Sequence, residues 1–487
     1  MHMKRVLLTA LLAIGISAAQ AQYDIIPKPS RISLDKKGTV LNMQTPPQVT
    51  ERLTDDIQSA EGWRMTVSRR GILLEGRTDA GIFYARQALR QVLADSPASL
   101  PYAVIESSPR FAYRAMHLDV ARHFFGKEMV KQYLDMMALH AMNTLHFHLT
   151  DDQGWRIEMK RWPKLSTVGS VRNRTVIGRN AGLYDYTPHG GCFSQDDIRE
   201  IVAYARERHI TIIPEVDMPG HMLAALAAYP ELGCTGGPYE VCPDWGVFDD
   251  ILCAGNERVY RFLEDVIDEL TELFPAPFIH LGGDEAPRVR WQQCSRCQER
   301  MRQEGLKNEA QLQGYMVRRM EKYLTQKGRR LIGWDEIAEC DIDTSAVIMS
   351  WRGHEGGFEA AKRGHDVIMS PTSALYFDYD QLEDQWEKPF LIGGYNPLSK
   401  VYAFDPAPDS LPAAVRRHII GTQANLWTEY IAYKELLEYQ VLPRMAALSE
   451  VQWTDPRQKD YADFLRRLPR LLSIYDAQGW RYCKKSQ

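Results

Sequence analysis

From Phe111 to Glu429 the chain repeats one hydrophobic pattern, in which a short apolar run is followed by a longer stretch with apolar residues at helical spacing. This alternation is typical of parallel strands connected by amphipathic helices. The expected strands are 114–119, 144–152, 211–217, 277–285, 330–336, 346–351, 367–378 and 419–429. The expected helices are 127–140, 195–209, 258–274, 309–327 and 357–363.

Eight strand and helix units over about 340 residues predict an α/β fold of the (β/α)₈ TIM barrel type. The second helix has the clearest start, because Ser194 can cap it and Asp197 occupies its third position. A doubly wound sheet is the alternative. It would need a glycine-rich phosphate loop after its first strand, and the sequence has none there.

A different pattern precedes the barrel. Residues 63–68 alternate like a strand, a second strand follows Gly71, and Asp79 can cap a helix. We therefore expect a small α+β domain at 22–110, with a proline-containing joint before a catalytic barrel and C-terminal helical segment at 111–487.

The first 21 residues predict a signal peptide. Lys4 and Arg5 precede an apolar run, and Ala19-Gln20-Ala21 has the small-x-small form of a cleavage site. The protein is expected to be exported, to the periplasm or the medium, and no later stretch approaches the length of a membrane span.

Composition excludes some functions and leaves others open. A net charge of -4 gives no basic field for nucleic acid. Eleven Trp and 23 Tyr would suit a sugar-binding pocket, although most aromatic residues belong to cores. Export would allow disulfides among the eight cysteines, with pairing that spacing does not reveal. Cys294 and Cys297 form a C-x-x-C, but without a second such pair or nearby histidines we expect structural or free thiols and no metal.

Polar or aromatic residues close most of the expected strands. In a barrel these ends converge on one face, so they would surround one pocket, although individual carboxylates could instead cap neighbouring helices. The residues concerned are Asp119, Arg122, Asp151, Asp152, Asp217, Asp284, Glu285, Trp334, Asp335, Glu336, Trp351, Arg352, Tyr376, Asp378, Trp427 and Glu429.

Asp284 and Glu285 stand out because an apolar run and two glycines precede them and Pro287 follows. Adjacent acids on a solvated helix have no such context. Carboxylates and tryptophans without a metal-ligand set indicate glycoside hydrolysis. Ordinary glycosidases separate two carboxyls by about 5–9.5 Å across the scissile bond, which adjacent residues suit poorly. Adjacency favours one carboxyl as proton donor and its neighbour as a holder of another part of the sugar.

Three motifs then identify a family. The run from His280 to Glu285, together with 145–156 and 214–221, resembles the family 20 glycoside hydrolases, the β-N-acetylhexosaminidases. The resemblance covers essentially the whole mature chain, since 23–110 also resembles the small domain that precedes the barrel in that family.

The resemblance implies substrate-assisted catalysis, in which the sugar's own 2-acetamido oxygen attacks the anomeric carbon and gives an oxazolinium ion. Glu285 would be the general acid and base, Asp284 would accept the acetamido N–H, and Tyr376 would donate to the acetamido oxygen. Asp284 is expected to raise the pKa of Glu285. Other implied roles are support of the acid by Asp151 and His221, an aromatic box of Trp334, Trp351 and Trp427, and hydroxyl binding by Arg114, Asp378 and Glu429.

The expected protein is therefore an exo-acting enzyme that releases terminal GlcNAc or GalNAc and requires no cofactor. The alternatives are a disaccharide-releasing relative and a catalytically silent sugar-binding protein. Arg114 and Asp378 argue against the first, and intact Asp284, Glu285 and Tyr376 argue against the second. Ala115 and Phe147 depart from the family pattern at positions without a proposed role. Trp386 could stack on a second sugar. The partner is an amino-sugar glycan, and the oligomeric state is left open.

Overall fold

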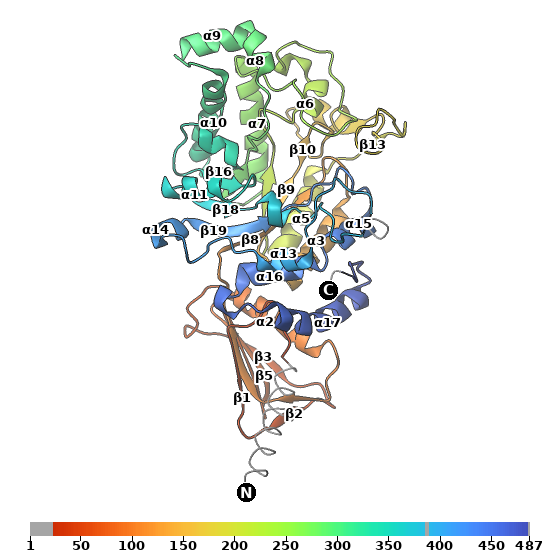
Figure 1. The fold of residues 1–487 in the computed structure, drawn as a ribbon, viewed down its shortest axis with the longest axis vertical. Coiled ribbons are helices and arrows are strands. Elements are labelled where there is room, and N and C mark those ends of the chain that lie inside the picture. Colours follow the sequence, from red (N-terminus) through yellow and green to blue (C-terminus); the bar gives the residue numbers. More distant parts are fainter. Residues whose placement is uncertain (1–22, 385–388, 486–487) are drawn as a thin grey trace.

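The computed structural model describes residues 23–384 and 389–485, with a closed eight-stranded parallel barrel at its centre (Figure 1). The barrel order is β14, β15, β16, β17, β18, β19, β8 and β9. Their bounds are β8 Tyr113–Asp119, β9 Thr144–His148, β14 Thr211–Glu215, β15 Phe278–His280, β16 Arg330–Trp334, β17 Val347–Ser350, β18 Val367–Met369 and β19 Ile419–Ala424. The predicted (β/α)₈ fold is confirmed.

All eight strands occur where the hydrophobic runs predict them, and seven of them end earlier than predicted. The first ends as predicted at Asp119. In the others the polar residues that close each run lie outside the barrel ladder, in the loops and short elements after the strands. Those loops carry the functional side chains, as the C-terminal face of such a barrel usually does.

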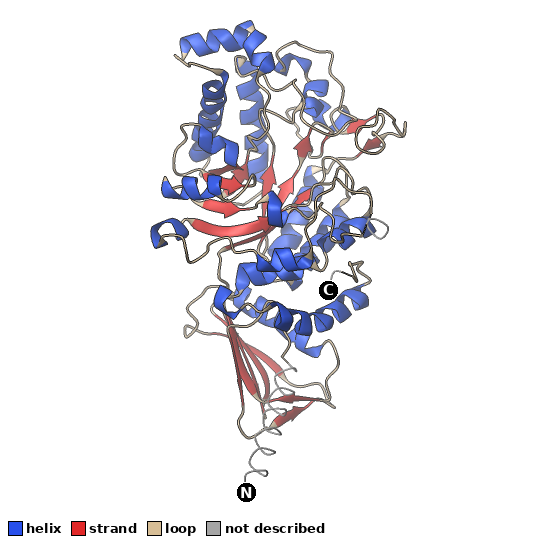
Figure 2. Ribbon diagram, viewed as in Figure 1, coloured by secondary structure: helices blue, strands red, loops and turns tan. Residues whose placement is uncertain are grey.

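Helices cover the outside of the barrel (Figure 2). The five that the sequence predicts are α3 Lys127–Leu139, α5 Gln195–Arg206, α7 Glu257–Leu273, α10 Glu309–Gln326 and α11 Glu355–Lys362. The cap predicted for α5 is present: the Ser194 side chain accepts from the Asp197 N–H, and Asp197 accepts from the Ser194 N–H. No described helix is both long and apolar enough to span a membrane.

The small domain lies at the lower end of the molecule in Figure 1. Its five-stranded sheet has the order β1 Arg31–Leu34, β7 Ala103–Ser107, β4 Trp63–Ser68, β5 Gly71–Gly76 and β3 Val49–Leu53, with β2 Val40–Asn42 paired to β6 Ser99–Pro101 beside it. Helix α2 (Asp79–Leu93) packs on this sheet through Tyr84, Ala88 and Val92, which are buried with Trp63 and Met65. The predicted boundary at residue 110 itself remains a prediction.

C-terminal helices α16 (Arg444–Trp453) and α17 (Tyr461–Gln478) lie between the barrel and the small domain (Figure 1). Trp453 donates from Nε1 to Ser107 Oγ at 2.8 Å, and its ring meets Tyr84 edge-on. Arg467 donates to the Ile25 carbonyl and pairs with Glu450. The C-terminal segment therefore ties the two parts together.

Arg114 belongs to this junction and lies at the opposite end of its strand from the C-terminal face of the barrel, so its predicted role in hydroxyl binding is wrong. Its guanidinium forms a two-pronged ion pair with Glu61 of the small domain at 2.7 and 2.8 Å and also donates to the Phe111 and Ala141 carbonyls. The physical reason is its position near the start of β8, whereas a pocket residue must follow the strand's C-terminal end.

Arg114→Ala is expected to lower the free energy of unfolding by about 2–3 kcal/mol. This is somewhat less than for a fully buried pair, because water reaches Glu61. Urea unfolding followed by tryptophan fluorescence measures the change. Arg31→Ala, which removes an exposed ion pair with Glu106, is the control and should cost at most about 1 kcal/mol. Equal losses in the two variants would contradict the assignment of Arg114 to the junction.

Candidate active site

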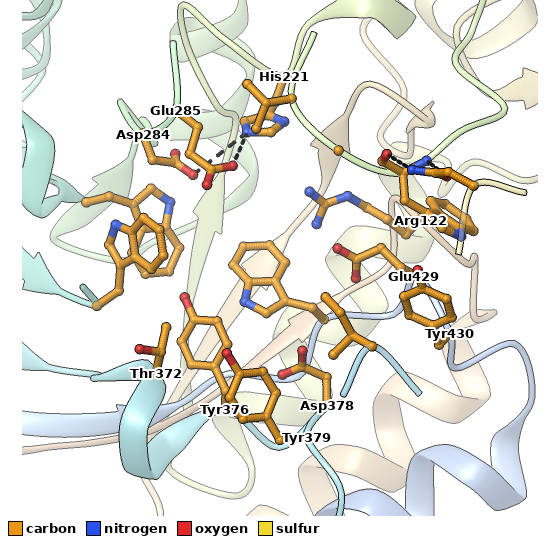
Figure 3. Close-up of a pocket in the computed structure, with 18 residues that line it drawn as sticks. Arg122, His221, Asp284, Glu285, Thr372, Tyr376, Asp378, Tyr379, Glu429 and Tyr430 are labelled. Atoms are coloured by element: carbon orange, nitrogen blue, oxygen red, sulfur yellow. Dashed lines mark hydrogen bonds and ion pairs between the residues drawn. The ribbon is translucent and has the colours of Figure 1, made fainter. Parts of the chain in front are cut away.

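A pocket of about 430 Å³ opens at the C-terminal ends of the barrel strands (Figure 3). Ten of the residues that line it come from strand ends or the turns that follow: Arg122, His221, Asp284, Glu285, Trp334, Trp351, Tyr376, Asp378, Trp427 and Glu429. All ten are predicted site residues, predicted supporting residues or predicted strand ends, and His221, the supporting residue, follows the third strand. The barrel thus brings together residues that lie more than 300 positions apart.

The turn after β15 is held in a left-handed backbone conformation at Gly282 (φ 62°), Gly283 (φ 103°) and Glu285 (φ 47°). A Cβ on Gly282 would lie 1.6 Å from Asp217 Oδ1, and one on Gly283 would lie 2.4 Å from Ile337. The two glycines are therefore required for the close approach that presents Asp284 and Glu285. A left-handed Glu285 is a local strain of the kind that functional sites retain.

Asp284 is buried at the pocket wall, and its Oδ1 accepts no hydrogen bond within the described part of the chain. Burial raises its pKa, and nearby His221 opposes that rise. An unsatisfied buried carboxylate oxygen is costly unless a ligand supplies a donor. Asp284 is thus placed to accept an N–H from a molecule in the pocket.

Asp217 is a supporting residue to which sequence reasoning gave no role. Its Oδ1 accepts from the Gly283 N–H at 3.0 Å, and burial next to the Asp284 carboxylate raises its pKa well above the ordinary value. The raised pKa favours the protonated carboxyl of Asp217, and its hydrogen bond to Asp284 favours the ionised form of Asp284. Its position at the end of a predicted strand was the available signal.

Glu285 is half-exposed, with its Oε2 3.6 Å from His221 Nε2. The predicted direction of its pKa shift is wrong. The hydrogen bond and positive charge of His221 lower the pKa of Glu285, and this outweighs its partial burial. Burial opposes a charge on His221, but Asp151 and Asp152, 3.2 and 3.0 Å from its Nδ1, raise its pKa well above the ordinary value.

The predicted Asp151–His221 pair is part of a longer buried chain of charges. Asp151 Oδ2 is 2.8 Å from both His148 Nε2 and Arg122 Nη2, and His148 Nδ1 is 2.5 Å from Glu215 Oε2. Glu215 and Asp151 raise the pKa of His148 to about 10 against its burial. Cationic partners within the protein therefore surround both Glu215 and Asp151.

The aromatic box is present. Trp334 and Trp427 have ring centroids 5.8 Å apart, and Trp351 stacks on Tyr376 at 6.4 Å. Trp334 donates from Nε1 to Glu215 and Trp351 donates to Glu336, so both indoles are fixed in orientation. In Figure 3 the Tyr376 hydroxyl points into the pocket toward the side that carries Asp284.

At the other side of the pocket Arg122 lies with Asp378 and Glu429 (Figure 3). Burial raises the pKa of both acids. Asp378 Oδ1 is a second buried oxygen without a hydrogen-bond partner among the described residues. Arg122 therefore takes the place predicted for Arg114. The sequence signal was its position after β8, three residues beyond Asp119.

Long loops complete the rim with residues that sequence reasoning missed, namely Asn180, Trp245, Gly246, Val247, Tyr379, Ile392 and Tyr430. No local pattern marks them, because loops contribute through tertiary position alone. Trp386, which could stack on a second sugar, lies outside the described residues.

The pH dependence of kcat/KM is expected to be bell-shaped with its maximum below neutrality. Glu285 must carry a proton to act as an acid, so activity falls as pH rises through its lowered pKa. Asp284 must be ionised, so activity also falls as pH drops through its raised pKa. His221→Ala removes the charge that lowers the pKa of both carboxyls, so it should move the limb that Glu285 sets, and with it the maximum, about one pH unit higher, whereas His418→Ala, far from the pocket, should not. An unmoved limb in His221→Ala would contradict the assigned charge.

Known proteins match both parts of this architecture. The model of the glycosyl hydrolase family 20 catalytic domain matches residues 111–456, and that of domain 2 of the same family matches residues 33–106. A barrel with an acid pair in an aromatic pocket already indicates a glycoside hydrolase. The chain belongs to glycosyl hydrolase family 20.

Individual relatives agree. A β-hexosaminidase of Porphyromonas gingivalis is 45% identical over 87% of this chain and 54% of its own length. One of Akkermansia muciniphila is 33% identical over 92% and 90%. The exo-β-N-acetylglucosaminidase of Vibrio harveyi, solved with N-acetylglucosamine, superposes with a TM-score of 0.84 at 30% identity, covering 95% of this chain and 78% of that one. The chain thus spans about half the length of the Porphyromonas relative.

Proposed function

We propose that the protein is an exo-acting, retaining β-N-acetylhexosaminidase that removes terminal non-reducing β-GlcNAc or β-GalNAc from glycans or chito-oligosaccharides. The observation that carries the proposal is the buried Asp284 Oδ1, which lacks a donor within the described chain and lines a pocket together with three tryptophans and Glu285. An acetamido N–H is the donor that such an oxygen would accept, and the box would enclose the acetamido methyl.

In the proposed reaction the acetamido oxygen attacks the anomeric carbon while Glu285 protonates the departing glycosidic oxygen. Asp284 orients the amide and stabilises the positive charge that develops on it, and Tyr376 donates to the acetamido oxygen. Glu285 then removes a proton from water, which opens the oxazolinium ion from the face that the leaving group occupied. The anomeric configuration is therefore retained.

Removal of one terminal sugar is supported by the charged side chains at one side of the pocket. Arg122, Asp378 and Glu429 line it there and offer charged hydrogen-bond partners for the hydroxyls of a single non-reducing residue. This argument replaces the one based on Arg114 against a disaccharide-releasing enzyme.

The test compares aryl β-GlcNAc, β-GalNAc and β-glucoside substrates, with and without a thiazoline that mimics the oxazolinium ion. We expect activity on the two N-acetyl sugars, inhibition by the thiazoline, and negligible activity on the glucoside. Equal activity on the glucoside would contradict assistance by the acetamido group. Binding of GlcNAc without turnover would instead support a silent sugar-binding protein.

We also propose export to the periplasm or the medium. Support comes from the charged, apolar and small-residue order of residues 1–21, which lie outside the described structure. Cell fractionation of the native host, with N-terminal sequencing of the mature protein, tests the proposal, and a cytoplasmic product that retains Lys4 would contradict it.

A further inference from the structure

Four cysteines that do not line the catalytic pocket gather around α8 (Val289–Gln293) and α9 (Ser295–Gln303), the two helices near the top of Figure 1. They are Cys234, Cys253, Cys294 and Cys297, and their Sγ atoms all lie within 4.8 Å of one another. Three of them are fully buried and Cys234 is half-buried. We propose that these four thiolates bind one structural zinc ion.

The spacing of the sulfurs fits one tetrahedral ion. Sγ of Cys253 is 3.7 Å from that of Cys294 and 3.7 Å from that of Cys297, and Cys234 is 3.9 Å from Cys297. Four ligands at a zinc–sulfur bond length of about 2.3 Å stand about 3.8 Å apart at the corners of a tetrahedron. A disulfide would bring two sulfurs to about 2.05 Å. An iron–sulfur cluster would separate its ligands further, since several ions lie between them.

The backbone at Gly255 allows the two cysteine-bearing segments to approach each other closely. A Cβ on Gly255 would lie 2.2–2.4 Å from backbone atoms of Arg296 and Cys297, so only glycine lets the turn after Cys253 approach the C-x-x-C segment this closely. Arg296 donates to the Gly233 and Cys234 carbonyls at 2.9 and 3.3 Å. Its positive charge beside the site offsets part of the net charge of -2 that four thiolates and one Zn²⁺ would carry.

Four protein ligands leave no open coordination position, which is the arrangement of a structural rather than a catalytic zinc site. The ion would join two loops of the active face. Cys234 and Cys253 belong to the connection from β14 to α7, which also carries His221 and Trp245. Cys294 and Cys297 follow the turn that carries Glu285. The contact is reinforced by Trp291, which donates from Nε1 to the Leu252 carbonyl at 2.9 Å.

The absence of a second C-x-x-C led sequence reasoning to expect no metal. The second half-site is instead split between two cysteines of one long loop, 41 to 63 residues from their partners. Only the folded chain places them together.

The test is metal analysis of the full-length protein, purified without added metal and washed with a chelator. We expect about one zinc per chain by mass spectrometry. Cys253→Ser and Cys297→Ser should retain less than about a tenth of it. Cys340→Ser, which removes a half-buried thiol outside the cluster, should retain all of it. The unmutated protein is also titrated with a mercurial in the presence of a chromogenic chelator. The zinc should be released as the thiols react, and this result does not depend on whether the serine variants fold.

A second comparison leaves all four thiols in place. Gly255→Ala should lose zinc to EDTA at least about tenfold faster than Gly126→Ala, where an added methyl meets nothing within 4 Å. The proposal is overturned if the protein holds no zinc and peptide mapping shows disulfides among the four cysteines, if iron replaces zinc, or if Cys297→Ser retains the metal. None of these readouts depends on the glycosidase activity.

Discussion

Glu285→Gln is expected to lower kcat/KM about 10³-fold on substrates with poor leaving groups, because glutamine cannot donate the proton that the departing oxygen needs. On an aryl substrate whose phenol leaves readily, the first step needs little acid and the loss should be much smaller. The measurement is kcat/KM against leaving-group pKa for a series of aryl β-GlcNAc substrates. The variant should show a steeper dependence than the unmutated protein.

Glu272→Gln, an exposed glutamate on α7, is the matched control for handling and folding. It should follow the dependence of the unmutated protein. If Glu285→Gln lost the same factor on every substrate, Glu285 would act in positioning and not in proton transfer.

Asp284→Asn is expected to lower kcat about 10²–10³-fold, because an amide cannot stabilise the positive charge that develops on the acetamido group. The effect should fall on kcat more than on KM, since the charge is present in the transition state and not in the bound substrate. Steady-state kinetics on one aryl β-GlcNAc substrate measure both constants.

Asp217, which is hydrogen-bonded to Asp284, supplies a matched control for this variant. Asp217 is a second buried aspartate, and its raised pKa favours the neutral, protonated form. Asn at this position is neutral too and can still accept from the Gly283 N–H and donate to Asp284, so Asp217→Asn should cost less than about tenfold. Asp217→Leu, which can do neither, should cost more than Asp217→Asn. Equal losses in Asp284→Asn and Asp217→Asn would show that charge is not what distinguishes the two residues.

The acid pair and its surroundings could be located from sequence because each member occupies the same local position, just after an apolar strand. A parallel barrel brings all such positions to one face, although the strands that precede them differ in sequence. The residues that meet in one pocket in this way are Asp284, Glu285, Tyr376, Asp378, Trp427 and Glu429. The same rule explains why the role predicted for Arg114 was wrong. Arg114 lies near the start of β8 and Arg122 follows its end, and the two ends of a strand face opposite sides of the barrel.

Electrostatics could not be worked out in this way. Adjacent Asp284 and Glu285 predicted a raised pKa for Glu285, but His221, made cationic by Asp151 and Asp152, lowers it. The proton on Asp217 and the link from Glu215 through His148 to Asp151 likewise depend on side chains from different strands.

Hydrophobic periodicity and the order of polar residues at strand ends therefore predicted the barrel, the cap of α5 and the position of Asp284 and Glu285 after a strand, because these depend on neighbours along the chain. The charge state of that pair, the exchange of Arg114 for Arg122 and the four converging cysteines depend on distances between segments that loops bring together. Burial and charge depend on which segments are close in space, so only the tertiary structure decides these three features.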